Sequence, residues 1–196
     1  MLIASAIAIQ AQACRRDPAP QGAVASDACP AEWLQAPPAD TAIAVPPGGG
    51  RVVFHAAAQG SQDYTCRRTE GDGGAAYAWT FTGPEATLSD CRGAPVGRHF
   101  ASDAGAGAPE WSLSSGEYVV GHKLAAWTPP GGAGGSVPWL LIGTDGRGGD
   151  GPLARARYVV RATTHGGVAP AEPCDATRSG AAVKVPYTAD YFFYAP

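Results

Sequence analysis

The feature of this sequence that most restricts its possible folds is a series of short segments of alternating apolar and polar residues, separated by Gly and Pro. Seven such segments follow one another, at residues 60–66, 77–90, 96–100, 116–127, 137–144, 156–170 and 185–194. The chain has 27 Gly and 18 Pro among its 196 residues, and they are spread along its whole length. Gly and Pro interrupt long helices and favour turns between short strands. The sequence therefore predicts many short strands and little helix.

The alternation also assigns the faces of individual strands. In the last segment, Val185, Tyr187, Ala189, Tyr191 and Phe193 share one face, and Lys184, Thr188 and Asp190 share the other. A period of two residues of this kind is typical of an antiparallel sheet with one buried face. Residues 137–142 are continuously apolar, which indicates a strand covered on both sides. We expect an all-β fold, either an antiparallel β-sandwich or a closed β-barrel.

The N-terminal residues predict export. Residues 1–13 contain a short apolar run and the pattern Ala11-Gln12-Ala13, which resembles a truncated export signal. Residues 14–41 are rich in Pro and Ala and have no period, so we expect a tether before a single β domain at 42–196. The predicted location is extracytoplasmic: secreted, periplasmic or on the surface as a lipoprotein. No segment is long enough to be a transmembrane span.

The five cysteines agree with an oxidising compartment. Cys14 is either the lipid-bearing first residue of a lipoprotein, and so a possible lipid anchor, or an unpaired cysteine after simple cleavage. The other four, Cys29, Cys66, Cys91 and Cys174, have three possible disulfide pairings. No Cys-x-x-Cys motif and no closely spaced His pair is present, so no metal site is expected. A net charge of −3 with mixed signs predicts no nucleic-acid partner.

A set of phrases between residues 46 and 194 resembles one family of secreted bacterial and fungal proteins, catalogued as domain of unknown function 3455. The matching phrases include Gly60-Ser61-Gln62, Trp79-Thr80-Phe81, Pro138-Trp139-Leu140-Leu141 and residues 185–191. The resemblance implies a secreted protein of unknown activity. It also favours a Cys66–Cys174 disulfide, because both residues lie in family-like phrases, and leaves Cys29–Cys91 as the second. Gly131 to Gly135 precede a strand and not a helix, so no nucleotide cofactor is expected.

Candidate site residues are few, and each has a structural alternative. His99, with Glu85, is the weak catalytic candidate for a hydrolase or lyase, and the favoured alternative is a strand histidine hydrogen-bonded to a neighbouring backbone group. Trp111, Trp79 and Tyr64 are candidates to bind a sugar or a small apolar molecule, or else are core residues. Arg155, Arg157 and Arg161 would share one strand face, as an anion site with Arg157 as its candidate ligand or as a solvated surface.

We therefore expect a non-catalytic binding or cell-surface module, whose partner is an unknown small molecule or glycan. The alternatives are the hydrolase or lyase and a small-ligand carrier with an aromatic-lined cavity.

Overall fold

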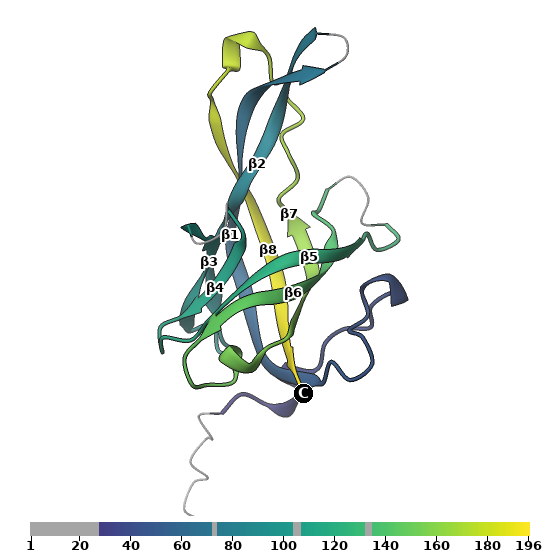
Figure 1. The fold of residues 1–196 in the computed structure, drawn as a ribbon, viewed down its shortest axis with the longest axis vertical. Helices are drawn as coiled ribbons and strands as arrows, with labels where there is room; N and C mark the ends of the chain where they lie inside the picture. Colours follow the sequence, from purple (N-terminus) through teal and green to yellow (C-terminus); the bar gives the residue numbers. More distant parts are fainter. Residues whose placement is uncertain (1–27, 72–73, 104–106, 132–134) are drawn as a thin grey trace, which may run out of the picture.

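The computed structural model describes residues 28–71, 74–103, 107–131 and 135–196. In this part of the chain, eight antiparallel strands form one sheet, and β8 pairs with β1 so that the sheet closes into a ring (Figure 1). The strands are β1 (Arg51–Gly71), β2 (Gly74–Ser89), β3 (Pro95–Ala101), β4 (Pro109–Leu113), β5 (Tyr118–Trp127), β6 (Trp139–Gly148), β7 (Tyr158–Gly166) and β8 (Ala182–Ala195). The all-β prediction is confirmed, with a single closed sheet as its form.

Helical structure in the described residues is limited to short 3-10 turns. These are η1 (Ala31–Leu34), η2 (Thr41–Ile43), η4 (Leu153–Arg155) and η5 (Ala176–Arg178). Strands β1, β2 and β8 are longer than the others and extend beyond the closed part of the sheet (Figure 1). The Gly116 turn between β4 and β5 has a φ of 91°, which only glycine adopts without strain.

The main core fills the inside of the ring. Trp111, Tyr191 and Phe193 are its largest fully buried side chains, and Leu153 with Ala156 closes the end of the ring near the C-terminus. The face of β8 expected to be buried contributes Tyr187, Ala189, Tyr191 and Phe193 to this core, as the alternation predicted. Burial of these side chains is the main source of stability for the fold.

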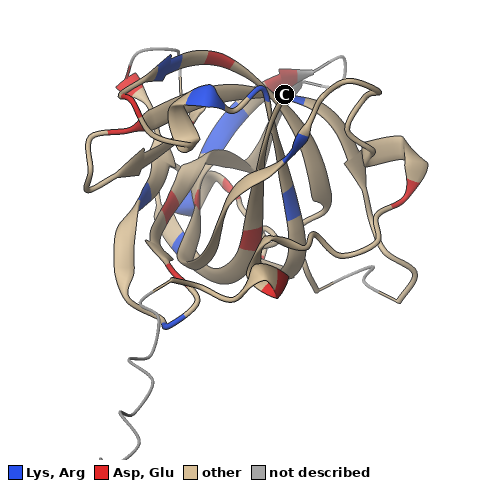
Figure 2. Ribbon diagram, turned by 90° about the horizontal axis from the view of Figure 1, so that it is seen from below, with Lys and Arg blue, Asp and Glu red and all other residues tan. Residues whose placement is uncertain are grey.

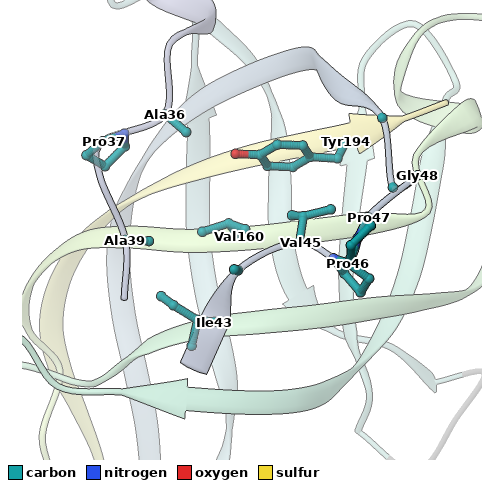
Figure 3. Close-up of a pocket in the computed structure, with 13 residues that line it drawn as sticks. Ala36, Pro37, Ala39, Ile43, Val45, Pro46, Pro47, Gly48, Val160 and Tyr194 are labelled. Atoms are coloured by element: carbon teal, nitrogen blue, oxygen red, sulfur yellow. The ribbon is translucent and has the colours of Figure 1, made fainter. Parts of the chain in front are cut away.

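A second apolar cluster lies on the outer face of the sheet. Val160 and Ala162 of β7 and Phe192 of β8 pack there against Ile43, which belongs to the segment before β1. Figure 3 shows this segment crossing over Val160 and Tyr194. Both faces of the middle of β7 are consequently buried. The alternation of its residues had instead suggested one buried face and one solvated face.

Besides the Cys29–Cys91 disulfide, aromatic stacking and hydrogen bonds attach the segment before β1 to the sheet. The Trp33 ring stacks on the His55 ring at 3.9 Å, and His55 stacks in turn on Phe192 at 4.1 Å. The Trp33 indole N–H donates to the His55 carbonyl at 3.1 Å, and the His55 Nδ1–H donates to the Trp33 carbonyl at 2.6 Å. The His55 Nε2 lies 2.9 Å from the Asp190 carboxylate. This part of the expected tether is therefore ordered against β1 and β8.

The described residues contain two disulfides, Cys29–Cys91 and Cys66–Cys174, so the predicted pairing is confirmed. They hint at an oxidising, extracytoplasmic setting. The expected export signal at 1–13 and the lipidation candidate Cys14 lie outside the described residues. In the described part of the chain, no helix has the length and apolar character needed to cross a membrane.

Candidate functional site

The inside of the ring opens into a pocket at the end opposite Leu153. The pocket has a volume of about 430 Å³. Its deeper wall carries Gln62, Tyr64, His99, Trp111, Arg161 and Tyr191, and we call this cavity the interior pocket. Phe81, Pro84, Val137, Leu140 and Ile142 supply apolar surface around these residues. Gly121 allows β5 to approach β6 closely beside the pocket, because a Cβ there would lie 2.7 Å from the Gly143 carbonyl oxygen.

His99 lies within an aromatic stack at the wall of the interior pocket. Its ring is parallel to that of Trp111 at 4.5 Å, and the Tyr191 ring meets it edge-on at 4.8 Å. The His99 Nδ1–H donates to the Glu110 carbonyl at 2.8 Å. The pKa of His99 is lowered to about 3, mainly by burial and also by the Arg161 charge, against the raising effect of the Glu110 hydrogen bond. His99 is therefore neutral at neutral pH.

Arg161 places a positive charge inside the ring, where the residue is only 8% exposed. Its Nε–H and Nη2–H both donate to the Pro138 carbonyl, at 3.1 Å and 2.8 Å. No carboxylate of a described residue lies within 4.0 Å of the guanidinium. The guanidinium also approaches the Tyr191 hydroxyl and acts to lower that tyrosine's pKa. A buried cation without a counter-charge is costly, because neutral oxygens replace only part of its hydration.

Two further hydrogen-bond donors in the pocket wall lack acceptors. Among the described residues, the Gln62 Nε2 and the Trp111 Nε1 are buried atoms without a hydrogen-bond partner. Gln62 approaches the Tyr187 hydroxyl and acts to lower the tyrosine pKa, but without the geometry of a hydrogen bond. Burial dominates and raises the pKa of both Tyr187 and Tyr191, so their hydroxyls stay protonated. The polar groups of the wall are thus mainly donors, which suits a ligand that brings acceptors.

The structure brings together four of the residues singled out from the sequence, namely His99, Trp111, Tyr64 and Arg161. His99 and Trp111 are in contact, and the Tyr64 ring lies in the same wall, with its hydroxyl donating to the Gly167 carbonyl at 2.7 Å. No sequence pattern had singled out Gln62 as a site residue. Arg161 was expected to share a face with Arg155 and Arg157, yet it points inward and they do not.

The remaining candidates lie elsewhere. Glu85 is on the outer face of β2 and pairs with Lys184, whereas His99 faces inward from β3. Trp79 lies on the extension of β2, where its indole N–H donates to the Glu172 carbonyl at 2.8 Å. Arg157 is exposed at the other end of the ring. The His99–Glu85 pair expected of a hydrolase or lyase is therefore not assembled.

Another cavity, of about 480 Å³, lies outside the ring, beneath the segment before β1 (Figure 3). Its wall is formed by Ala36, Ile43, Val45, several Pro and Gly residues, Val160 and Tyr194. The Tyr194 hydroxyl is its one polar side-chain group among the described lining residues, and burial raises the pKa of that tyrosine. This cavity offers little beyond apolar contact. No group of three or more His, Cys, Asp or Glu within the described residues is arranged to hold a metal ion.

Comparison with known proteins gives one match. Residues 46–195 match the family described as "Protein of unknown function (DUF3455)". This range includes all eight strands and every residue of the interior pocket. Comparison with curated proteins and with solved structures finds no match.

Proposed function

This chain belongs to the DUF3455 family, and we propose that it is an extracytoplasmic, non-catalytic binding domain. Its interior pocket holds a small molecule with an apolar body and a carboxylate at one end. Arg161 supplies the charge for the carboxylate, and the aromatic and aliphatic wall covers the rest of the ligand.

The observation that carries this proposal is the buried charge of Arg161. Its guanidinium donates to the Pro138 carbonyl and approaches the Tyr191 hydroxyl, and no described carboxylate balances its charge. A ligand carboxylate would supply the missing counter-charge in a site with low solvent exposure, where charge-assisted hydrogen bonds are strong. The neighbouring Gln62 Nε2, which has no acceptor among the described residues, is a second donor for the same group.

The walls of the interior pocket support the apolar part of the ligand. A volume of about 430 Å³ is within the range of small-molecule sites. Apolar lining with a few fixed polar groups is the usual composition of such sites, in which the polar groups set orientation and specificity. His99 contributes an aromatic surface here, because it is neutral and held in its stack with Trp111.

A catalytic role receives less support from the same residues. Glu85 faces away from His99, and the other polar side chains that line the pocket are Gln62, Tyr64, Lys123, Arg161 and Tyr191. A general base needs a positioned nucleophile or substrate proton within hydrogen-bond reach. A histidine whose pKa is about 3 is also a weak base at neutral pH.

The test is titration calorimetry of the full chain with a panel of aromatic and medium-chain carboxylates, each beside its neutral primary amide. We expect at least one carboxylate to bind, and its amide to bind at least 10-fold more weakly. The variant Arg161→Met should lose this preference, and Arg178→Met, at an exposed arginine of η5, should keep it. Arg161→Met should fold, because replacing a buried ion by an apolar residue is often neutral or stabilising.

Thermal melts of both variants check that they fold. Equal affinity for a carboxylate and its amide, or unchanged carboxylate binding by a folded Arg161→Met, would contradict the proposal.

A further inference from the structure

A second positively charged site lies at the other end of the closed sheet. Arg51, Arg147, Arg155 and Arg157 line one depression beside the end of β8, with a volume of about 390 Å³. All four are exposed, and none makes an ion pair with a described acidic residue. Figure 2, which views the molecule from below, shows Lys and Arg segments beside the C-terminus. We call this depression the arginine site.

Four other exposed cations of the described surface have a partner, whereas Arg67, Lys123 and Arg178 are also exposed and unpaired but do not line this depression. Lys184 pairs with Asp63 and Glu85, and Arg68 pairs with Glu70. Arg92 pairs with Asp90, and the Arg98 guanidinium lies over the Phe100 ring. Asp145, two residues before Arg147, accepts from His122 at 2.7 Å. The arginine site is therefore a concentration of uncompensated positive charge on a chain whose net charge is −3.

The arginines are carried by a well-ordered part of the backbone. Arg155 and Arg157 flank Ala156, which is fully buried in the core, so the chain presents both arginines outward. The Arg157 N–H donates to the Tyr194 carbonyl at 2.7 Å, and the Thr144 hydroxyl donates to the Ala156 carbonyl at 2.8 Å. Arg51 begins β1, opposite Ala195 in the ladder with β8. Side chains that extend from fixed backbone lose less entropy when they bind a ligand.

From this arrangement we infer that the arginine site binds a phosphate-bearing ligand. Four guanidinium groups around one depression suit a multiply charged oxyanion better than a single carboxylate, because each guanidinium can donate two parallel hydrogen bonds to a phosphate group. The depression is larger than one phosphate ion needs, which favours a diphosphate or a phosphate ester. The site shares no lining residue with the interior pocket, so the inference is independent of the function proposed above.

A soluble phosphate compound and the headgroup of an anionic phospholipid offer the same chemistry. The first arm of the test therefore uses inorganic pyrophosphate, measured by titration calorimetry at low salt. The second uses sedimentation with vesicles of phosphatidylglycerol and phosphatidylcholine, compared with phosphatidylcholine alone. Both arms use the full chain, the double variant Arg155→Glu/Arg157→Glu, and the control Arg67→Glu/Arg178→Glu, which changes the net charge equally at exposed arginines of β1 and η5.

We expect pyrophosphate to bind the unmodified chain and the control, and to bind the Arg155/Arg157 variant at least 10-fold more weakly. Sedimentation with phosphatidylglycerol vesicles that pyrophosphate competes away, and that the Arg155/Arg157 variant loses, would identify a headgroup as the source. No binding in either arm, or equal weakening in both double variants, would overturn the inference, because the second result reflects net charge alone. Circular dichroism melts of both variants confirm that they are folded.

Discussion

Acidification should destabilise this protein through His99, and the structure gives the size of the effect. The pKa of His99 is about 3 in the folded chain, against a reference value of 6.5. Above pH 6.5 His99 is neutral in both the folded and the unfolded state. Between pH 6.5 and pH 3 only the unfolded state binds the proton, so the free energy of unfolding falls as the pH falls.

Each pH unit in this window costs about 1.4 kcal/mol. Going from pH 7.5 to pH 4.5 should therefore remove about 2.7 kcal/mol through His99 alone. The full difference of about 4.8 kcal/mol is lost only below pH 3. Carboxylates whose pKa is lowered by folding, such as Asp90 and Asp175, are also lost as stabilising groups at low pH, which is why a variant comparison is needed.

The assay is urea unfolding at pH 7.5, 6.0 and 4.5 for the unmodified chain and for His99→Asn. The Asn side-chain amide can still donate to the Glu110 carbonyl, but it does not titrate. The variant should be less stable at pH 7.5, because it loses the stack with Trp111, and this gap should shrink by about 2.7 kcal/mol at pH 4.5. His165→Asn, at an exposed histidine, should follow the unmodified chain. A gap between His99→Asn and the unmodified chain that is the same at all three pH values would refute the reasoning.

Two other predictions concern the links that hold distant segments together. Replacing both Cys66 and Cys174 by Ala opens a loop with a sequence separation of 108. In the chain-entropy model this should lower the free energy of unfolding, measured by urea unfolding without reductant, by about 4.7 kcal/mol. A loss below about 1 kcal/mol would contradict the prediction. Trp33→Ala removes the ring stacked on His55 and should cost about 2 kcal/mol and speed amide hydrogen exchange in residues 29–36, whereas the half-exposed Leu34→Ala should change little. Unchanged exchange in Trp33→Ala would show that the Cys29–Cys91 disulfide alone holds this segment.

Much of the fold was predictable because strand patterns are local. The alternation along residues 184–193 assigned Tyr187, Tyr191 and Phe193 to the buried face of β8, as found. The continuous apolar run at 137–142 correctly indicated a strand covered on both sides, since Ile142 lies in the inner core and Leu141 in the outer cluster. The disulfide pairing followed from the family resemblance and not from spacing.

The site was predictable only in part, because it depends on which face of each strand lies inside. Period-two alternation separates Arg161 from Val160 but does not say which of the two points into the ring. Val160 is apolar and yet lies outside, where the segment containing Ile43 covers it, so Arg161 is left inside.

The amino-acid pattern alone establishes the class of the fold, the division of residues between the two faces of each strand, and the kinds of side chain available for binding. The tertiary structure decided the closure of β8 onto β1, the pairing that opposes Ala86 to His99 and so leaves Glu85 outside, and the gathering of the arginines at the far end of the ring. These are contacts between segments far apart in the chain. No local pattern encodes them, because they depend on register and on which surfaces remain to be covered once the sheet has closed.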